Sequence, residues 1–474
     1  MTAVKAVLAA VVPLSGDEAY FWECSRHLDW CYQEQPPLAI WAMIPARALL
    51  GDTVLAVRLP TLLVGAVLGW LLSLIVLRLG GTRRQAAVLW GVLHATPMFL
   101  IGSCYASTDA LMMTAFAGAT AAAMAIANGD RRGWWAFGVA VGLGFLAKFT
   151  VVLVLPALVP LLLLPQVRAQ LRTPVPWLAA LLCCALTAPV WIWAMQHDWD
   201  SIAWQLERVP DGFQPLHVVK FWGGSAAIVT PTLGVAALVA WFVSRRHGTA
   251  SWRVLRWAAA APIVFWSALA VLGPASAHWS APSMLLGLVA VSLLEFPGRR
   301  QLVQWGVATG VVVLAAVASF LLLPEPWIAA EQAFRQWQGR PERAVLHHAA
   351  SVDDLTAEVV RRLRPGELAA SQRFSFVHTV SFLSQGKVPT LLYRGAKHGL
   401  SSLYWHSAEE LRGRDLLVYT TDPALIAELR PLFASVEEEV PFEVRSGGKV
   451  VQVWRFLRCR NLQAPERGFT RLRT

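Results

Sequence analysis

Long apolar runs separated by short charged gaps dominate the first two thirds of the chain. A membrane-spanning helix needs roughly 17–25 residues to cross a hydrocarbon core of about 30 Å. Eleven runs approach that length, at approximately 1–14, 59–79, 85–102, 108–127, 133–147, 149–165, 175–195, 218–243, 256–272, 281–297 and 302–323. The pattern therefore predicts a polytopic α-helical membrane protein with about eleven transmembrane helices. No cleavage site follows the short first run, so we interpret it as a retained span.

The last part of the chain has a different pattern, because its apolar runs shorten to the length of strands. Helix-like and strand-like segments alternate there, at 353–363, 416–419, 423–432 and 450–456. We therefore predict a transmembrane domain over 1–323, with a long outer loop at 15–58. A small α/β domain is expected over 324–474.

Composition supports the membrane interpretation. The chain is 56% hydrophobic and only 15% charged, with a mean hydropathy of +0.49. Soluble domains usually carry about 25% charged residues. A soluble globular enzyme, a disordered chain and a fibrous repeat are therefore excluded. The six cysteines are too few for a disulfide scaffold, although the sequence allows one disulfide between Cys24 and Cys31.

The charges in the gaps predict which side of the membrane each gap faces. Alternate gaps hold thirteen basic residues against two acids, and the other gaps hold six basic residues against eleven acids. The positive-inside rule places the first set in the cytoplasm. The N-terminus is then cytoplasmic, and the loops 15–58, 103–107, 196–217 and 273–280 face outward with the C-terminal domain. Because the basic loops are short and cytoplasmic, the net charge of +11 does not indicate a nucleic-acid partner.

Two adjacent acids, Asp17 and Glu18, follow the first span in the outer loop. The loop is rich in aromatic residues, which is typical of segments in the membrane interface. A carboxylate held there is poorly solvated and could serve as a general base. Helix capping explains the acids equally well, because Gly16-Asp17 before an amphipathic stretch fits an N-cap.

Asp109 and Lys148 stand out because they are charges at the ends of apolar spans on the same predicted side. Asp109 could be a helix cap or an interfacial residue. Lys148 could extend to the interface, but it lies on the side that the positive-inside rule depletes of cations. A fixed cation near carboxylates suits an anionic group such as phosphate.

Three more residues face outward near span ends. Arg58 could contact phosphate or anchor its helix at the interface. His278 could donate to phosphate beside an aromatic face that Trp279 offers to a sugar ring; a solvated His beside an interfacial Trp is the alternative. The carboxylates of Asp17, Glu18 and Asp109 could together bind a divalent cation, although the sequence contains no metal-ligand motif.

Six short motifs occur in order along the first ten spans. They are Asp17-Glu18-Ala19-Tyr20-Phe21-Trp22, Gln35-Pro36-Pro37-Leu38, Val57-Arg58-Leu59-Pro60, Thr108-Asp109-Ala110-Leu111, Ala147-Lys148-Phe149-Thr150 and Ala277-His278-Trp279-Ser280-Ala281-Pro282. Together they resemble bacterial GT-C glycosyltransferases that use polyprenyl-phosphate sugars. That class contains the dolichyl-phosphate-mannose protein mannosyltransferase superfamily and its aminoarabinose transferase relatives.

The resemblance implies an enzyme of the bacterial inner membrane with a periplasmic C-terminal domain. It implies transfer of a sugar from a polyprenyl-phosphate carrier to an acceptor hydroxyl or phosphate. Asp17 matches the first-loop acid of the family, the candidate base, and Asp109 matches its second acid. Lys148, Arg58 and His278 fall where contacts to phosphate would be useful.

Two departures separate the chain from the aminoarabinose transferases. Glu34-Gln35-Pro36-Pro37 stands where they have an acid-Lys-Pro-Pro motif, and Tyr20 stands where they have Arg. Two cationic residues that could contact phosphate are therefore missing at these positions. Lys148 and Arg58 become the main candidates for binding the phosphate. Tyr20 and Glu34 remain candidates for substrate binding.

The sequence leaves the sugar, the acceptor and the oligomeric state open. The acceptor could be lipid A, another glycolipid, a polysaccharide or a protein. A transporter or flippase for lipids or polyprenyl-phosphate sugars is the main alternative, but its polar residues usually lie near the bilayer midplane on broken helices. A scaffold that uses only the C-terminal domain is less well supported, because it has no need of paired acids near a cation.

Overall fold

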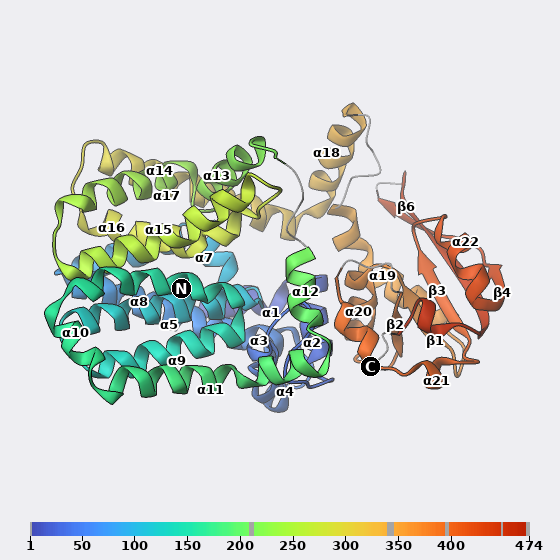
Figure 1. Cartoon of the computed structure of the whole chain (residues 1–474). Helices are drawn as coiled ribbons and strands as arrows, with labels where there is room; N and C mark the ends of the chain where they lie inside the picture. The colour runs from blue at the N-terminus through green and yellow to red at the C-terminus, as the bar shows by residue number, and fades with distance from the viewer. Residues whose placement is uncertain (1, 208–212, 339–345, 394–397, 447–448, 471–474) are drawn as a thin grey trace. The chain divides into compact units, whose positions relative to one another are not determined.

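The structure is a computed structural model that describes residues 2–207, 213–338, 346–393, 398–446 and 449–470 (Figure 1). The chain divides into two compact units that share the N-terminal segments between them. The first unit comprises Met1–Val11, Gln35–Ala42 and Arg58–Ala315. The second unit comprises Val12–Glu34, Met43–Val57 and Ala316–Thr474.

The first unit is helical. Its elements are α1 (Thr2–Val11), α3 (Leu38–Trp41), α5 (Val54–Arg78, shared with the second unit), α6 (Arg83–His94), α7 (Pro97–Gly102), α8 (Thr108–Ala127), α9 (Arg132–Ala147), η1 (Phe149–Leu163), α10 (Pro165–Leu171), α11 (Pro174–Gln196), α12 (Asp200–Glu207), α13 (Leu216–Ile228), α14 (Pro231–Val243), η2 (Ser244–Arg246), α15 (Ala250–Ala270), η3 (Ala277–Ser280), α16 (Ala281–Leu293) and α17 (Arg299–Leu322, also shared).

Four of the described helices, α5, α8, α11 and α17, are long and apolar enough to cross a membrane. The pairs η1/α10 and α13/α14 reach that length only when taken together, and they are bent by 111° and 103°. Length and composition therefore support a membrane protein with four to six spans among the described residues, against the eleven that the sequence predicts. The span predicted at 256–272 is α15, which has 21 residues but is not among the helices apolar enough to cross a membrane. The other predicted spans correspond to shorter helices or to broken ones.

The prediction of one continuous helix over 218–243 is wrong. α13 ends at Ile228, α14 begins at Pro231, and Thr230 between them has a φ of 74°. Proline disfavours the α conformation in the residue before it, so the helix cannot run straight through Thr230. The segment predicted at 149–165 is also not a regular α-helix. It forms the 3-10 helix η1, which contains Pro156 and Pro160, and prolines lack the N–H that an α-helix needs.

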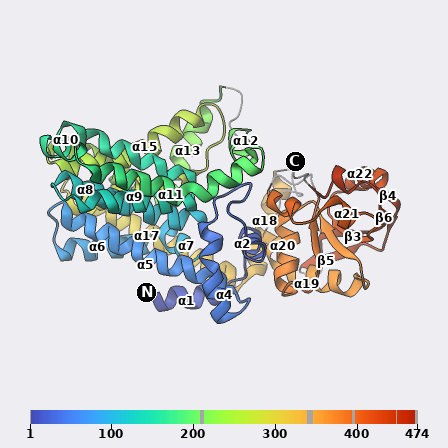
Figure 2. The same ribbon diagram turned by 60° about the horizontal axis from the view of Figure 1, so that its bottom comes forward.

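The centre of the first unit is α8, which is buried along almost its whole length. Its sequence is rich in alanine, and small side chains let neighbouring helices approach closely. α9 lies between α8 and α11 (Figure 2). A Cβ atom added to Gly138 of α9 would overlap the carbonyl of Ala179 in α11, so glycine is required for that close packing. The close approach holds α9 tightly against α11.

The second unit contains a mixed six-stranded sheet with helices on both faces. Its elements are α2 (Gly16–Cys24), α4 (Met43–Leu50), α18 (Pro324–Trp337), α19 (Leu346–Arg362), β1 (Leu368–Ser371), α20 (Phe374–Leu383), β2 (Thr390–Leu392), η5 (Leu400–Tyr404), α21 (Ala408–Leu411), β3 (Leu416–Thr420), α22 (Leu425–Leu429), η6 (Arg430–Leu432), β4 (Phe433–Glu438), β5 (Phe442–Ser446), β6 (Lys449–Leu462) and η7 (Pro465–Arg467). The strand order is β2-β1-β3-β6-β4, and β5 also pairs with β6.

Alternation along the central strands builds the two cores of this α/β domain. Leu416 and Val418 of β3 pack with α22, whereas Leu417 and Tyr419 pack with α19 and α20. Successive strand residues point to opposite faces, so a strand covered on both faces is apolar at every position. The predicted strands at 416–419 and 450–456 are confirmed as parts of β3 and β6. The predicted helix at 353–363 is confirmed within α19, while 423–432 forms only a short helix and a 3-10 turn.

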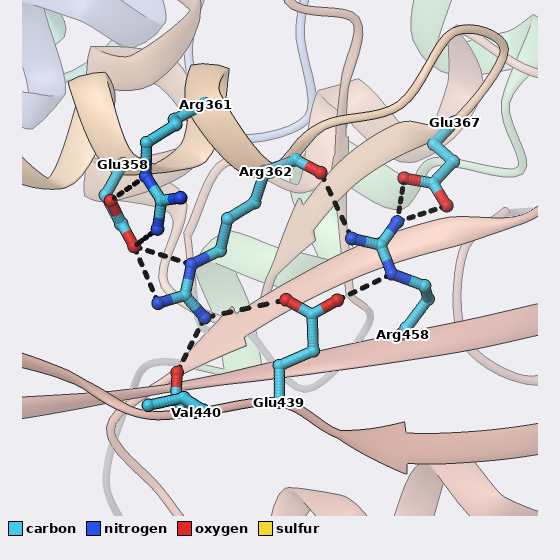
Figure 3. Close-up of polar contacts among 7 residues, drawn as sticks. All are labelled: Glu358, Arg361, Arg362, Glu367, Glu439, Val440 and Arg458. Carbon is cyan, nitrogen blue, oxygen red and sulfur yellow. Dashed lines mark hydrogen bonds and ion pairs between the residues drawn. The ribbon is translucent and has the colours of Figure 1, made fainter.

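A buried arginine of β6 joins three segments of this domain (Figure 3). Arg458 donates to both oxygens of Glu367, at 2.7 Å to Glu439 and at 3.1 Å to the carbonyl of Arg362. Both Arg458 and Glu367 are almost inaccessible to solvent. Because each buried charge needs its partner, removal of one side chain alone should destabilise the domain.

The network continues onto α19. Arg362 pairs with Glu358 at 2.6 Å, and it donates to the carbonyl of Val440 at 2.6 Å (Figure 3). The hydrogen bond from Arg361 lowers the pKa of Glu358 from 4.5 to about 2, with burial opposing and Arg362 adding to the effect. Glu358 therefore stays charged down to a lower pH than a free glutamate.

Candidate functional site

The carboxylate of Asp109 is at the centre of the candidate site in the first unit. It lies in the first turn of α8, but it is not the helix cap. The N-cap is Ser107, whose hydroxyl accepts the N–H of Ala110 at 3.4 Å. A serine cap and an acid in the first turn both favour a helix start, because they satisfy the free N–H groups and the helix dipole. The Asp109 carboxylate is therefore not needed for capping.

Asp109 instead forms an ion pair with Lys148. The Lys148 Nζ atom donates to Asp109 Oδ1 at 2.7 Å, and the two side chains are 23% and 22% exposed. Lys148 ends α9 with an extended backbone, which separates α9 from η1. The pair is thus partly shielded from water but open to a ligand.

His278 faces the same carboxylate from a third element. Its Nε2 atom lies 4.0 Å from Asp109 Oδ2, and its side chain is 54% exposed. The structure therefore brings together three residues that the sequence selected separately. An ammonium, a carboxylate and an imidazole at one point could bind an anion and exchange a proton with a neighbouring group.

Two small residues of α13 support the segment that carries His278. The hydroxyl of Ser225 donates to the carbonyl of Ala277 at 3.3 Å. A Cβ atom added to Gly224 would lie 2.8 Å from the Cβ atom of Ala277. Sequence reasoning missed both residues, and the available signal was the run of small residues at 223–225 inside an apolar segment.

Trp279 and Arg58 also belong to the first unit. The Trp279 ring packs against Trp266 of α15, with centroids 4.3 Å apart. Arg58 is buried, and its Nη1 atom donates to the carbonyl of Ala9 in α1 at 3.2 Å. Arg58 therefore connects α5 with α1 and is not an exposed interfacial anchor.

A small apolar recess lies beside the first turns of α8. Ala110 and Met113 line it on the α8 side, and Gly65, Phe99 and Leu285 line it from three other helices.

Asp17 and Glu18 lie on α2 in the second unit, and the structure separates their roles. Ser15 is the N-cap of α2, so the prediction that Gly16-Asp17 forms the cap is wrong. Glu18 is fully buried and completes a capping box, because its carboxylate accepts the N–H of Ser15 at 3.0 Å. Asp17 is exposed on the first turn. The capping interpretation is thus confirmed for Glu18, and Asp17 keeps an accessible carboxylate.

Tyr20 and Glu34 make their hydrogen bonds within the second unit. The Tyr20 hydroxyl donates to Glu34 at 2.7 Å, and Glu34 also accepts from the Ser401 hydroxyl at 2.9 Å and from the N–H of Leu400. Burial raises the pKa of Tyr20, which keeps the hydroxyl protonated as a donor. These two residues join the outer loop to the α/β domain.

Two open questions from the sequence concern cysteines and metal. Cys24 and Cys31 are both free and buried, without a disulfide between them. Among the residues described, no group of three His, Cys, Asp or Glu side chains is placed to hold a metal ion. The Glu18 carboxylate accepts a hydrogen bond in the capping box of α2, and the Asp109 carboxylate pairs with Lys148. We therefore assign no metal site to these carboxylates.

Solved structures of a bacterial protein share this fold. ArnT from Cupriavidus metallidurans bound to undecaprenyl phosphate has the same fold, with a TM-score of 0.66, 17% identity and coverage of 96% of both chains. Its apo form gives a TM-score of 0.64. The family described as dolichyl-phosphate-mannose-protein mannosyltransferase matches residues 34–193.

Two curated relatives agree with that assignment. Lipid A galacturonosyltransferase RgtD from Rhizobium johnstonii is 25% identical over 350 residues, which cover 69% of this chain and 70% of the relative. Undecaprenyl phosphate-alpha-4-amino-4-deoxy-L-arabinose arabinosyl transferase 1 from Pseudomonas fluorescens is 25% identical over 325 residues, or 64% and 56% of the two chains. In sequence and in fold the chain is thus similar to GT-C glycosyltransferases.

Proposed function

We propose that the chain transfers a sugar from a polyprenyl-phosphate carrier, such as undecaprenyl phosphate, to an acceptor at the periplasmic face of the bacterial inner membrane. The observation that carries the proposal is the ion pair between Lys148 and Asp109, with His278 4.0 Å from the same carboxylate. The names of the relatives and the ligand of the ArnT structure support a phosphate-linked lipid donor.

Lys148 binds the donor phosphate in this proposal. During transfer the phosphate gains negative charge as the bond to the sugar breaks, and a preorganised cation stabilises that charge. His278 supplies a second hydrogen bond to a phosphate oxygen.

The reaction is a direct displacement at the anomeric carbon. The acceptor oxygen forms a bond to that carbon, and the bond between the carbon and the phosphate oxygen breaks. The electron pair of the broken bond leaves with the polyprenyl phosphate. The acceptor proton passes to a carboxylate, for which we propose Asp17, and a positioned base typically contributes 10²–10⁴-fold to the rate. Asp109 holds Lys148 in place for the donor.

Lipid A is the first acceptor to test, because RgtD is named for its action on lipid A. The other candidate acceptors are another glycolipid, a polysaccharide and a protein. The sugar is a hexose or pentose derivative; galacturonic acid and aminoarabinose are the first two donors to compare.

The test is release of free polyprenyl phosphate from labelled polyprenyl-phosphate sugars by purified protein in nanodiscs. A donor panel is run with lipid A and with a crude envelope extract, beside Asp17→Asn and Lys148→Met. Asp130→Asn is the matched control, because Asp130 is an exposed acid at the opposite end of α8. We expect release with one donor, which Asp17→Asn and Lys148→Met slow strongly without abolishing it and which Asp130→Asn retains. Tight binding of donor lipid without release from any donor would instead favour a transporter.

A further inference from the structure

A third acid of the outer loop, Glu23, is buried against the C-terminal α/β domain. Its Oε2 atom lies 2.5 Å from His378 Nδ1, and its Oε1 atom accepts from Ser381 at 2.9 Å and from Thr390 at 3.4 Å. His378 is 1% exposed. Because a carboxylate can only accept, His378 must carry its proton on Nδ1, and the two side chains hold each other in one orientation.

The contact extends along the whole of α2, which lies beside α20. At the start of α2, a Cβ atom on Gly16 would overlap Ser375, so the two backbones approach closely there. At the other end, the rings of Trp22 and Phe382 pack edge to face with centroids 5.2 Å apart. α2 is thus fixed to the α/β domain at both ends.

Asp17 is carried by this same helix. It follows Gly16 directly, and it lies six residues before Glu23, which corresponds to about 9 Å along an α-helix. Helix α2 is a short rigid element, so any rotation or shift at Glu23 is transmitted to the Asp17 carboxylate. Displacement of a catalytic group by about 1 Å can lower a rate about 100-fold.

We propose that Glu23 is a positioning residue for Asp17, and that through it the α/β domain determines where the candidate base lies. The proposal rests on the role of Asp17 in the proposed function. An apolar side chain at position 23 could bury the same surface without the cost of desolvating a charge. The carboxylate, however, makes three directed contacts to α20 and β2, and directed contacts fix the rotation of α2 about its axis as well as its distance.

The test compares Glu23→Ala, Glu23→Gln, Asp17→Asn and the double variant Glu23→Ala with Asp17→Asn. Turnover is measured by release of polyprenyl phosphate, and donor affinity by equilibrium binding of labelled undecaprenyl phosphate. We expect Glu23→Ala to lower kcat about 10–100-fold while donor affinity stays within twofold. Glu23→Gln should recover most of kcat, because its amide oxygen still accepts from Ser381.

The double variant separates positioning from a general structural role. If Glu23 acts through Asp17, then Glu23→Ala should cause no further loss of kcat once Asp17→Asn is present. An equal loss in both backgrounds overturns the proposal, as does wild-type kcat in folded Glu23→Ala when Asp17→Asn is inactive. Retained turnover in Asp17→Asn is a different result, because it removes the assigned base of the proposed function first.

A milder variant covers the case in which Glu23→Ala does not fold. Ser381→Ala deletes one of the three contacts and leaves the carboxylate paired with His378. We expect a several-fold loss of kcat, again absent in the Asp17→Asn background. Unchanged kcat in Ser381→Ala, with the domain intact by thermal unfolding, would show that the directed contacts do not position Asp17.

Discussion

Replacement of Lys148 by methionine is a sharp test of the candidate site, because it removes the ammonium group and retains most of the side-chain length. In the structure the Lys148 Nζ atom lies 2.7 Å from Asp109, and each side chain is about one fifth exposed. A hydrogen bond to a charged group contributes about 1.5–3 kcal/mol, and each 1.4 kcal/mol corresponds to a tenfold change in affinity. Loss of one such contact to the donor phosphate should weaken donor binding about 10–150-fold.

Replacement of Asp109 by asparagine should change donor affinity in the opposite direction. The Asp109 carboxylate pairs with Lys148 and repels a phosphate that approaches it. Removal of its charge leaves the ammonium free for the phosphate, so donor affinity should stay equal or rise. Turnover should nevertheless fall, because Lys148 loses the partner that orients it. The two halves of one ion pair thus have opposite expected effects on donor binding.

The assay is equilibrium binding of labelled undecaprenyl phosphate to protein in nanodiscs, at low and high salt. Lys148→Arg is the control, because it retains the positive charge and should retain a salt-dependent affinity. Two results would refute the reasoning. One is a Lys148→Met protein that binds within twofold of wild type. The other is equal weakening by Lys148→Met and Asp109→Asn, since that is the behaviour of a purely structural pair.

Three further predictions concern the supporting structure. Arg458→Leu should lower the free energy of unfolding of the α/β domain by about 3–5 kcal/mol, because Glu367 stays buried without its partner. The double variant Arg458→Leu with Glu367→Leu should regain most of that free energy in thermal unfolding. A loss below about 1 kcal/mol in Arg458→Leu alone would contradict this prediction. Gly224→Val should displace η3 and lower turnover. Gly223→Val should keep normal turnover, because a Cβ atom there would meet no neighbouring segment within 4 Å. Equal turnover in the two variants would show that Gly224 does not support η3. Glu358, with its pKa lowered to about 2, contributes stability above pH 4.5 that is lost as the pH falls through 2. The melting midpoint should therefore fall over that range more steeply in wild type than in Glu358→Gln.

Much of the candidate site could be predicted from the sequence, because a charge in an apolar surrounding is conspicuous. Burial of an unpaired charge in a membrane is costly, so a charged residue at a span end indicates either an interface or a function. That reasoning selected Asp109, Lys148 and His278 from the pattern alone. It could not show that the three side chains meet, since Asp109 and Lys148 come from different helices, and His278 lies far along the chain.

The same limit explains the residues that were assigned differently or missed. Tyr20 and Glu34 stay predicted substrate contacts, but no sequence pattern showed that Glu34 accepts hydrogen bonds from Leu400 and Ser401, which lie 366 and 367 residues away. Glu23 gave no signal in the sequence, because its partner His378 is 355 residues away. No local pattern reports such a distant contact.

The sequence by itself determined the membrane class, the apolar helices, the alternating strands and the conspicuous charges at span ends. These features follow from local periodicity and from the cost of burying charge, both of which can be read within a few turns of chain. Only the tertiary structure decided which charge pairs with which, that Glu18 caps a helix, and that α2 is fixed to the α/β domain. The physical reason is that hydrogen bonds and ion pairs depend on positions within a few tenths of an ångström, and the packing of distant segments sets those positions.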